Sequence, residues 1–137
     1  MKKTKFNTLA MIALALAMLM CFFACAKVPA EGLWENATYR GDTTVGNGTK
    51  EIKADVVIGE DFITLTVKTD KATLGEALFE NGLVNDASFF DTLNGIKADW
   101  NADKAYWSFY KGETYMMHGI NDEKIGGGEH YRFVYTK

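Results

Sequence analysis

The chain has 137 residues, a formal net charge of −3, 47% hydrophobic residues and a single proline, and this composition is typical of one compact domain, not of collagen, a coiled coil or a disordered chain. Without the three lysines among its first five residues, it holds 12 basic and 18 acidic residues. This balance argues against nucleic-acid binding and against a polybasic contact with an anionic membrane, because both need a basic surface.

Residues 1–24 have the organisation of a secretory signal peptide. Three lysines precede the stretch 9–26, which contains no charged residue, and this order matches the charged and apolar regions of such a signal. At the end of the stretch Ala24 directly precedes Cys25, and a small residue before a cysteine resembles the lipobox of bacterial lipoproteins. We therefore expect an N-terminal signal helix, a lipid on Cys25 and an extracytoplasmic, lipid-anchored location at the cell membrane.

Two other outcomes are open for this segment. An ordinary signal peptidase could cut after Ala26, or the apolar stretch, which is just long enough to cross a bilayer, could be retained as an anchor. Cys21 is a poorer lipid acceptor because the bulky Met20 precedes it. Both cysteines lie at or before residue 25, so we expect no internal disulfide in the mature chain.

Residues 25–50 are expected to be a lipidated tether and a lead-in segment. The tether is assigned to residues 27–32, and residues 39–48 are rich in Gly, Asp, Asn and Thr, which predicts a loop or a loosely held strand.

The domain itself is assigned to residues 51–137, and it begins with a β-hairpin and a helix. Apolar and polar residues alternate up to Ile58, and residues 62–67 are apolar and β-branched, with a turn at residues 59–61. Residues 73–82 open with a capping-box spacing and close with Asn-Gly, so they predict a short helix that packs on the hairpin.

Three later segments, residues 93–98, 105–110 and 130–135, predict short strands separated by turns. Strands with a single helix between them are typical of an α+β fold. The sequence therefore predicts a β-grasp-like mixed sheet with one covering helix, preceded by the signal helix.

Several ordered motifs over residues 33–137 resemble the transcobalamin-like C-terminal domain, a β-grasp family found in uncharacterised bacterial surface lipoproteins. They lie at residues 33–39, 73–78, 94–99, 106–110, 119–120 and 131–135. In the animal cobalamin carriers this domain closes over a corrinoid that an α-helical barrel holds from the other side. This chain is too short to contain that barrel, and its loop 84–93 is shorter than in bacterial relatives, so the resemblance implies at most half of such a site.

The resemblance places the loop 115–118, just before Gly119-Ile120, at the position that approaches the corrinoid. The strand 106–110 adds an aromatic wall for a flat ligand, although Trp107 could instead pack in the core. Together with two phenylalanines of the preceding loop, these segments give nine candidate ligand contacts. They are Phe89, Phe90, Tyr106, Trp107, Tyr110, Tyr115, Met116, Met117 and His118.

No catalytic or metal site is expected. The chain has two serines, Ser88 and Ser108, neither in a nucleophile context, and the glycines 126–128 lack the lysine of a phosphate loop. His118 and His130 are too few imidazoles for a copper or haem site. We expect no cofactor and no enzymatic activity, but a binding module for cobalamin or another corrinoid-like ligand, or alternatively a protein–protein interaction module of a cell-surface or transporter complex.

Overall fold

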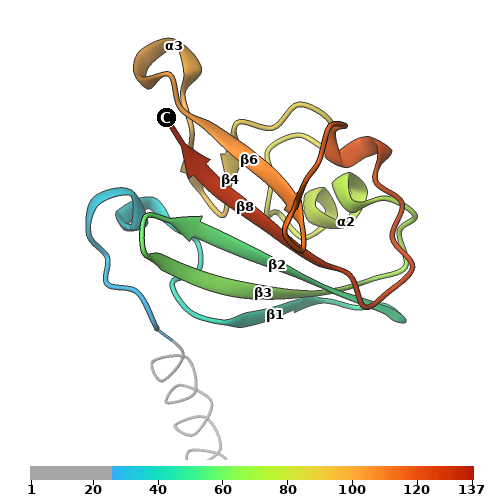
Figure 1. The fold of residues 1–137 in the computed structure, drawn as a ribbon. Helices are drawn as coiled ribbons and strands as arrows, with labels where there is room; N and C mark the ends of the chain where they lie inside the picture. The colour runs from blue at the N-terminus through green and yellow to red at the C-terminus, as the bar shows by residue number, and fades with distance from the viewer. Residues whose placement is uncertain (1–25) are drawn as a thin grey trace, which may run out of the picture.

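The computed structural model describes residues 26–137, so the predicted signal helix and Cys25 lie outside the described residues. The elements follow one another along the chain as shown in Figure 1. They are η1 (Gly32–Asn36), β1 (Thr43–Gly46), β2 (Lys50–Ile58), β3 (Asp61–Thr69), α2 (Leu74–Glu80), β4 (Thr92–Leu93), β5 (Ile96–Lys97), α3 (Trp100–Asp103), β6 (Tyr106–Lys111), β7 (Thr114–Tyr115), η2 (Ile120–Asp122) and β8 (His130–Thr136).

Six strands form one mixed sheet in the order β1-β3-β2-β8-β6-β7, and β4 and β5 form a separate two-stranded ribbon. β1 pairs with β3 and β2 with β8 in parallel, whereas the other neighbours are antiparallel. The predicted α+β class, with a mixed sheet and one main covering helix, is confirmed. None of the helices within residues 26–137 combines the length and the apolar character needed to cross a membrane.

The predicted hairpin and helix are confirmed. β2 and β3 pair over their whole lengths around a two-residue turn, with Ile58 opposite Asp61. α2 starts at the predicted cap, where the Thr73 hydroxyl accepts a hydrogen bond from the backbone N–H of Glu76. Its apolar stripe of Leu74, Ala77 and Leu78 is fully buried.

The segment 93–98 differs from the single strand that we expected. Asn94 and Gly95 both have positive φ angles, 53° and 79°, and two such residues form the tight turn that joins β4 to β5. The Asn94 side chain is buried, accepts from the backbone N–H of Tyr39 at 2.9 Å and donates to the Tyr39 carbonyl at 2.8 Å. The turn therefore fastens the N-terminal part of the domain to this ribbon.

The segment before β2 is part of the packed unit. Val28 and Trp34 are each 4% exposed and belong to the hydrophobic core. Residues 43–46, which we expected as a loop or a loose strand, form the edge strand β1 beside β3.

One face of the sheet is covered and the other is open. Residues of β2, β3 and β8 that point toward α2 are almost completely buried, and these include Ala54, Leu65 and Phe133. Because side chains alternate along a strand, the intervening residues of the same strands form the second face, where most are exposed or half-buried. We call the two surfaces the covered face and the open face.

Candidate functional site

The structure distributes the nine predicted contact residues over both faces of the sheet and over two loops. Tyr106, Tyr110 and Tyr115 lie on the open face. The turn between β6 and β7 sets this arrangement, because Gly112 has a φ of 60° and folds the chain so that Tyr115 pairs with Tyr110. Their ring centroids are 5.4 Å apart with an edge-on orientation. Tyr106 and Tyr115 are 41% and 50% exposed.

Trp107, Phe90 and Met116 lie on the covered side. Trp107 is 8% exposed, and its indole N–H donates to the carbonyl of Ile96 at 3.2 Å. The Phe90 ring meets Phe133 edge-on, with centroids 5.7 Å apart, and Met116 packs half-buried against the core. These three residues therefore belong to the packing of the domain and are separated by the sheet from the open-face tyrosines.

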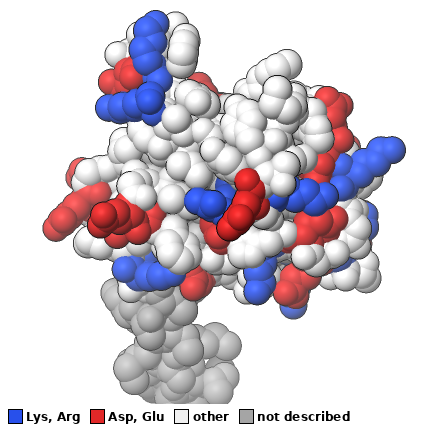
Figure 2. All heavy atoms as spheres, viewed as in Figure 1, with Lys and Arg blue, Asp and Glu red and all other residues white. Residues whose placement is uncertain are grey.

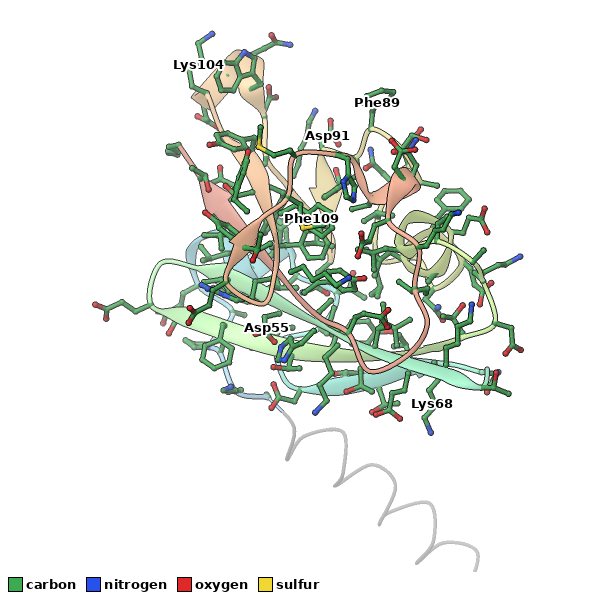
Figure 3. All side chains as sticks on the ribbon, turned by 45° about the vertical axis from the view of Figure 1, so that its right-hand side comes forward. Asp55, Lys68, Phe89, Asp91, Lys104 and Phe109 are labelled. Carbon is green, nitrogen blue, oxygen red and sulfur yellow. The ribbon has the colours of Figure 1, made fainter. Side chains whose placement is uncertain are left out.

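Phe89 and Met117 are the most exposed of the predicted residues, with 93% and 89% of their surface accessible. They belong to two loops, residues 86–90 and 116–119, which we call the edge loops. The two loops adjoin at Gly119 and Ser88. A side chain at Gly119 would come within 3.9 Å of the Ser88 carbonyl oxygen. Figure 3 shows Phe89 pointing away from the body of the domain.

The first edge loop is held in shape by its own polar side chains. One Asp86 oxygen accepts from the backbone N–H groups of Ser88 and Phe89, at 2.7 and 3.0 Å. These two hydrogen bonds lower the pKa of Asp86 below its usual value. At the base of the loop Asn85 donates to Asp91 at 2.9 Å. The loop thus holds Phe89 outward while Phe90 turns inward.

The second edge loop is held by Glu123, a residue that the sequence did not single out. Glu123 is buried, with 6% of its surface exposed. It accepts a hydrogen bond from the Tyr131 hydroxyl at 2.7 Å, and it lies 3.1 Å from Lys111 Nζ and 3.0 Å from His118 Nε2. This cluster ties the loop that carries Met117 to β6 and β8.

The partners of Glu123 also determine its charge state. Burial alone would raise the pKa of Glu123, but the hydrogen bonds from Tyr131, Lys111 and His118 outweigh burial, and the pKa lies below its ordinary value. Burial, followed by the bond to Glu123, raises the pKa of Tyr131. The cluster is therefore an ionised carboxylate beside a neutral phenol.

The open face contains polar partners that the sequence analysis also missed. Arg132 lies over the Tyr110 ring at 5.7 Å, which is within the range of a cation–π contact. Asp55, 9% exposed, lies 2.9 Å from His130 Nε2 and accepts from Thr64 at 2.7 Å. No local pattern signals the contacts of Arg132 and His130, because they join β8 to strands that are distant in the sequence, whereas Asp55 and Thr64 face each other within the β2–β3 hairpin.

Trp100 is a further exposed aromatic residue near this surface. It begins α3, is 57% exposed and meets Tyr106 with ring centroids 6.2 Å apart. Asp99 directly precedes Trp100 and caps α3 by accepting from the N–H groups of Asn101 and Ala102. An aspartate at this position is a sequence signal for the start of a helix. Among residues 26–137, no group of three or more His, Cys, Asp and Glu side chains is placed to hold a metal ion.

Figure 2 shows an area without Lys, Arg, Asp or Glu over the upper part of β6 and the loops beside it. The exposed large apolar side chains near this end of the domain come from α3, β6, β7 and the edge loops. We define the candidate site as the β7 edge of the sheet, with the edge loops on its covered side and the three tyrosines on its open face.

The solved structures that are similar to this chain include the following two. A candidate metal-binding protein from Ruminococcus gnavus ATCC 29149 superposes with a TM-score of 0.59 and 22% identity, over 65% of this chain and 98% of that one. Haptocorrin in complex with Cbi matches with a TM-score of 0.45 and 18% identity, over 68% of this chain and 26% of the haptocorrin chain. No family model and no curated protein sequence matches. The first similarity shows the fold alone.

Proposed function

We propose that this chain is a non-enzymatic binding module of the bacterial cell surface, anchored by a lipid on Cys25, with its binding surface at the β7 edge. The observation that carries the proposal is the exposure of Phe89 and Met117 on two adjoining loops. Neighbouring exposed apolar side chains on a small domain mark a contact surface more often than single ones do.

The structure of the loops supports a binding role. Asp86 holds the first loop by two hydrogen bonds, and Glu123 holds the second through His118. Since both loops are fixed before any ligand arrives, less conformational entropy is lost on binding. The exposed side chains of Phe89 and Met117 are uncharged and polarisable, which suits contact with an apolar or aromatic ligand.

The resemblance of the sequence to the transcobalamin-like domain makes a corrinoid the first ligand to test. Purified protein in detergent is titrated with cobalamin, and the absorbance spectrum and the thermal midpoint are followed. We expect saturable binding that is weakened at least about tenfold, or roughly 1.4 kcal/mol, by either Phe89→Ala or Met117→Ala.

Phe62→Ala is the matched control for this titration. Phe62 is a phenylalanine that is 44% exposed on β3, away from the edge loops. Binding that is unchanged in this control and lost in the two edge-loop variants supports the proposal. The absence of any spectral or thermal shift with cobalamin rejects the corrinoid as ligand.

A second candidate function, binding of another surface protein, is favoured by the open face. Tyr106, Tyr110 and Arg132 lie there without a covering layer from the described residues, and aromatic residues and arginine are enriched in protein interfaces. A photo-crosslinking residue at position 110, with one at the exposed Glu80 of α2 as control, tests this on intact cells. A discrete adduct from position 110 alone supports a protein partner, whereas equal labelling at both positions contradicts it.

A further inference from the structure

Residues 27 and 28, which follow the proposed lipid site, are hydrogen-bonded to the folded domain. The backbone N–H groups of Lys27 and Val28 both donate to the carbonyl oxygen of Arg40, at 2.8 and 2.9 Å. The Arg40 guanidinium donates back to the Val28 carbonyl at 3.4 Å, and the Val28 side chain is 4% exposed within the core. The folded unit therefore starts two residues after Cys25.

The side chain of Lys27 strengthens this attachment at one particular place. Its Nζ atom lies 3.9 Å from the centre of the Phe62 ring and 3.8 Å from Asp42 Oδ1. Phe62 belongs to β3 and Asp42 directly precedes β1. The start of the domain is thus fixed beside the first residues of β1 and β3, at the edge of the sheet opposite β7.

The length of the connection limits where the bilayer can lie. Three residues from Cys25 to Val28 reach at most about 11 Å even when fully extended. A lipid on Cys25 inserts its acyl chains into the bilayer, and two or three chains anchor it stably. The membrane surface then lies within about 11 Å of the β1–β3 edge, since the chain cannot reach further.

We infer that the bilayer is the partner of the β1–β3 edge: the anchored domain rests with this edge against the membrane and directs the β7 edge outward. The inference rests on the lipidation of Cys25 in the proposed function. Four strand spacings separate β3 from β7, or about 19 Å. Figure 3 shows Lys68 on the side where the described chain starts, and Phe89 and Lys104 on the opposite side.

The orientation comes from the short connection and not from attraction to lipid headgroups. Glu60 in the β2–β3 turn and Asp61 at the start of β3 are exposed close to Phe62, and the exposed Lys27 and Lys68 lie at the same edge. The edge therefore carries both signs of charge and lacks the polybasic cluster that anionic lipids attract. The unlipidated protein is therefore expected to stay in solution when mixed with vesicles that contain anionic phospholipid.

Single-cysteine labelling of the intact lipoprotein in vesicles tests the orientation. Lys68→Cys near the β1–β3 edge and Asp103→Cys on α3 are both exposed positions, and Cys25 itself carries the lipid. Each thiol receives the same fluorophore, and energy transfer to a headgroup-labelled phospholipid is measured. We expect transfer from position 68 to be several-fold greater than from position 103.

A lengthened connection provides the control. Twelve Gly and Ser residues inserted after Ala26 give a flexible reach of about 20 Å, so we expect the two positions to become nearly equivalent. Equal transfer in the original chain overturns the orientation while leaving the lipid anchor intact. Absence of acylation on Cys25, measured by the mass of the mature protein, rejects the anchor and the orientation together.

Discussion

The covered face and the open face of the sheet are formed by the same strands, but the first contributes the hydrophobic core and the second remains accessible to other molecules. In β8, Tyr131 and Phe133 are completely buried, whereas Arg132 and Val134 between them are half-exposed on the open face. The alternation of side chains along a strand therefore places residues that stabilise the domain next to residues that can meet another molecule. Substitutions at neighbouring positions should separate the two roles.

The largest effect is expected from Phe133→Ala. The Phe133 ring is 0% exposed and stacks on Phe109, with centroids 5.2 Å apart and an 8° angle between the rings. Removing a buried phenylalanine leaves a cavity, so we expect a loss of about 3–5 kcal/mol in the free energy of unfolding. Val134→Ala on the open face is the matched control, and urea denaturation measures both. Equal losses in the two variants would contradict the division between the faces.

A smaller effect is expected from Glu123→Gln, which removes the charge below the second edge loop. A neutral amide leaves Lys111 and His118 without their carboxylate, and we expect a loss of about 1–3 kcal/mol at pH 7. Urea unfolding at pH 7 gives this value. Glu129→Gln, which changes another carboxylate with a lowered pKa but only at a turn, is the control.

The Glu123 contribution should also depend on pH. Because the pKa of Glu123 is lower in the folded protein than its ordinary value of 4.5, the stabilisation is fully present above that value. It disappears as the pH falls through the folded-state pKa. The difference in stability between the wild type and Glu123→Gln should therefore shrink below pH 4.5. A difference that stays constant down to pH 3 would show that the carboxylate charge contributes nothing.

Thr73→Ala tests the covered face at the start of α2. The Thr73 hydroxyl accepts from the Glu76 N–H at 3.3 Å, and loss of such a cap costs about 1 kcal/mol. Thr44→Ala, at an exposed position of β1, should change the stability by less than about 0.5 kcal/mol. Thermal unfolding of the two variants decides whether the cap contributes.

The smallest effect on stability is expected at the edge loops. Phe89→Ala should change the free energy of unfolding by less than about 0.5 kcal/mol, because the ring is 93% exposed. Phe90→Ala should cost more, since that ring packs on Phe133. A large loss of stability in Phe89→Ala would assign this residue to folding and remove it from the binding surface.

Elements with a local signal were predictable from the sequence. The β2–β3 hairpin has its alternation, α2 has Thr73 and its apolar stripe, and β6 and β8 have dense aromatic and β-branched residues. In contrast, β7 has two residues and α3 has four, and segments this short show no periodicity.

The candidate site was only partly predictable. The sequence places Tyr106 and Trp107 next to each other, but which of them faces the core depends on the strands and helix that pack against β6. The role of Glu123 depends on Lys111, His118 and Tyr131, which come from three separate segments and meet only in the folded chain. The exposure of Phe89 similarly depends on the Asp86 turn and on the inward position of Phe90.

The position of β8 has a consequence for how the molecule folds. β8 is the last strand in the chain, yet it lies between β2 and β6, pairing with β2 in parallel and with β6 in antiparallel orientation. While the chain is being synthesised, the β2–β3 hairpin and β6 have no common neighbour until residues 130–136 emerge. Sheets that depend on such distant pairings fold on the order of milliseconds to seconds. The six-stranded sheet can therefore be completed only after β8 has been made, because no earlier strand joins the two halves.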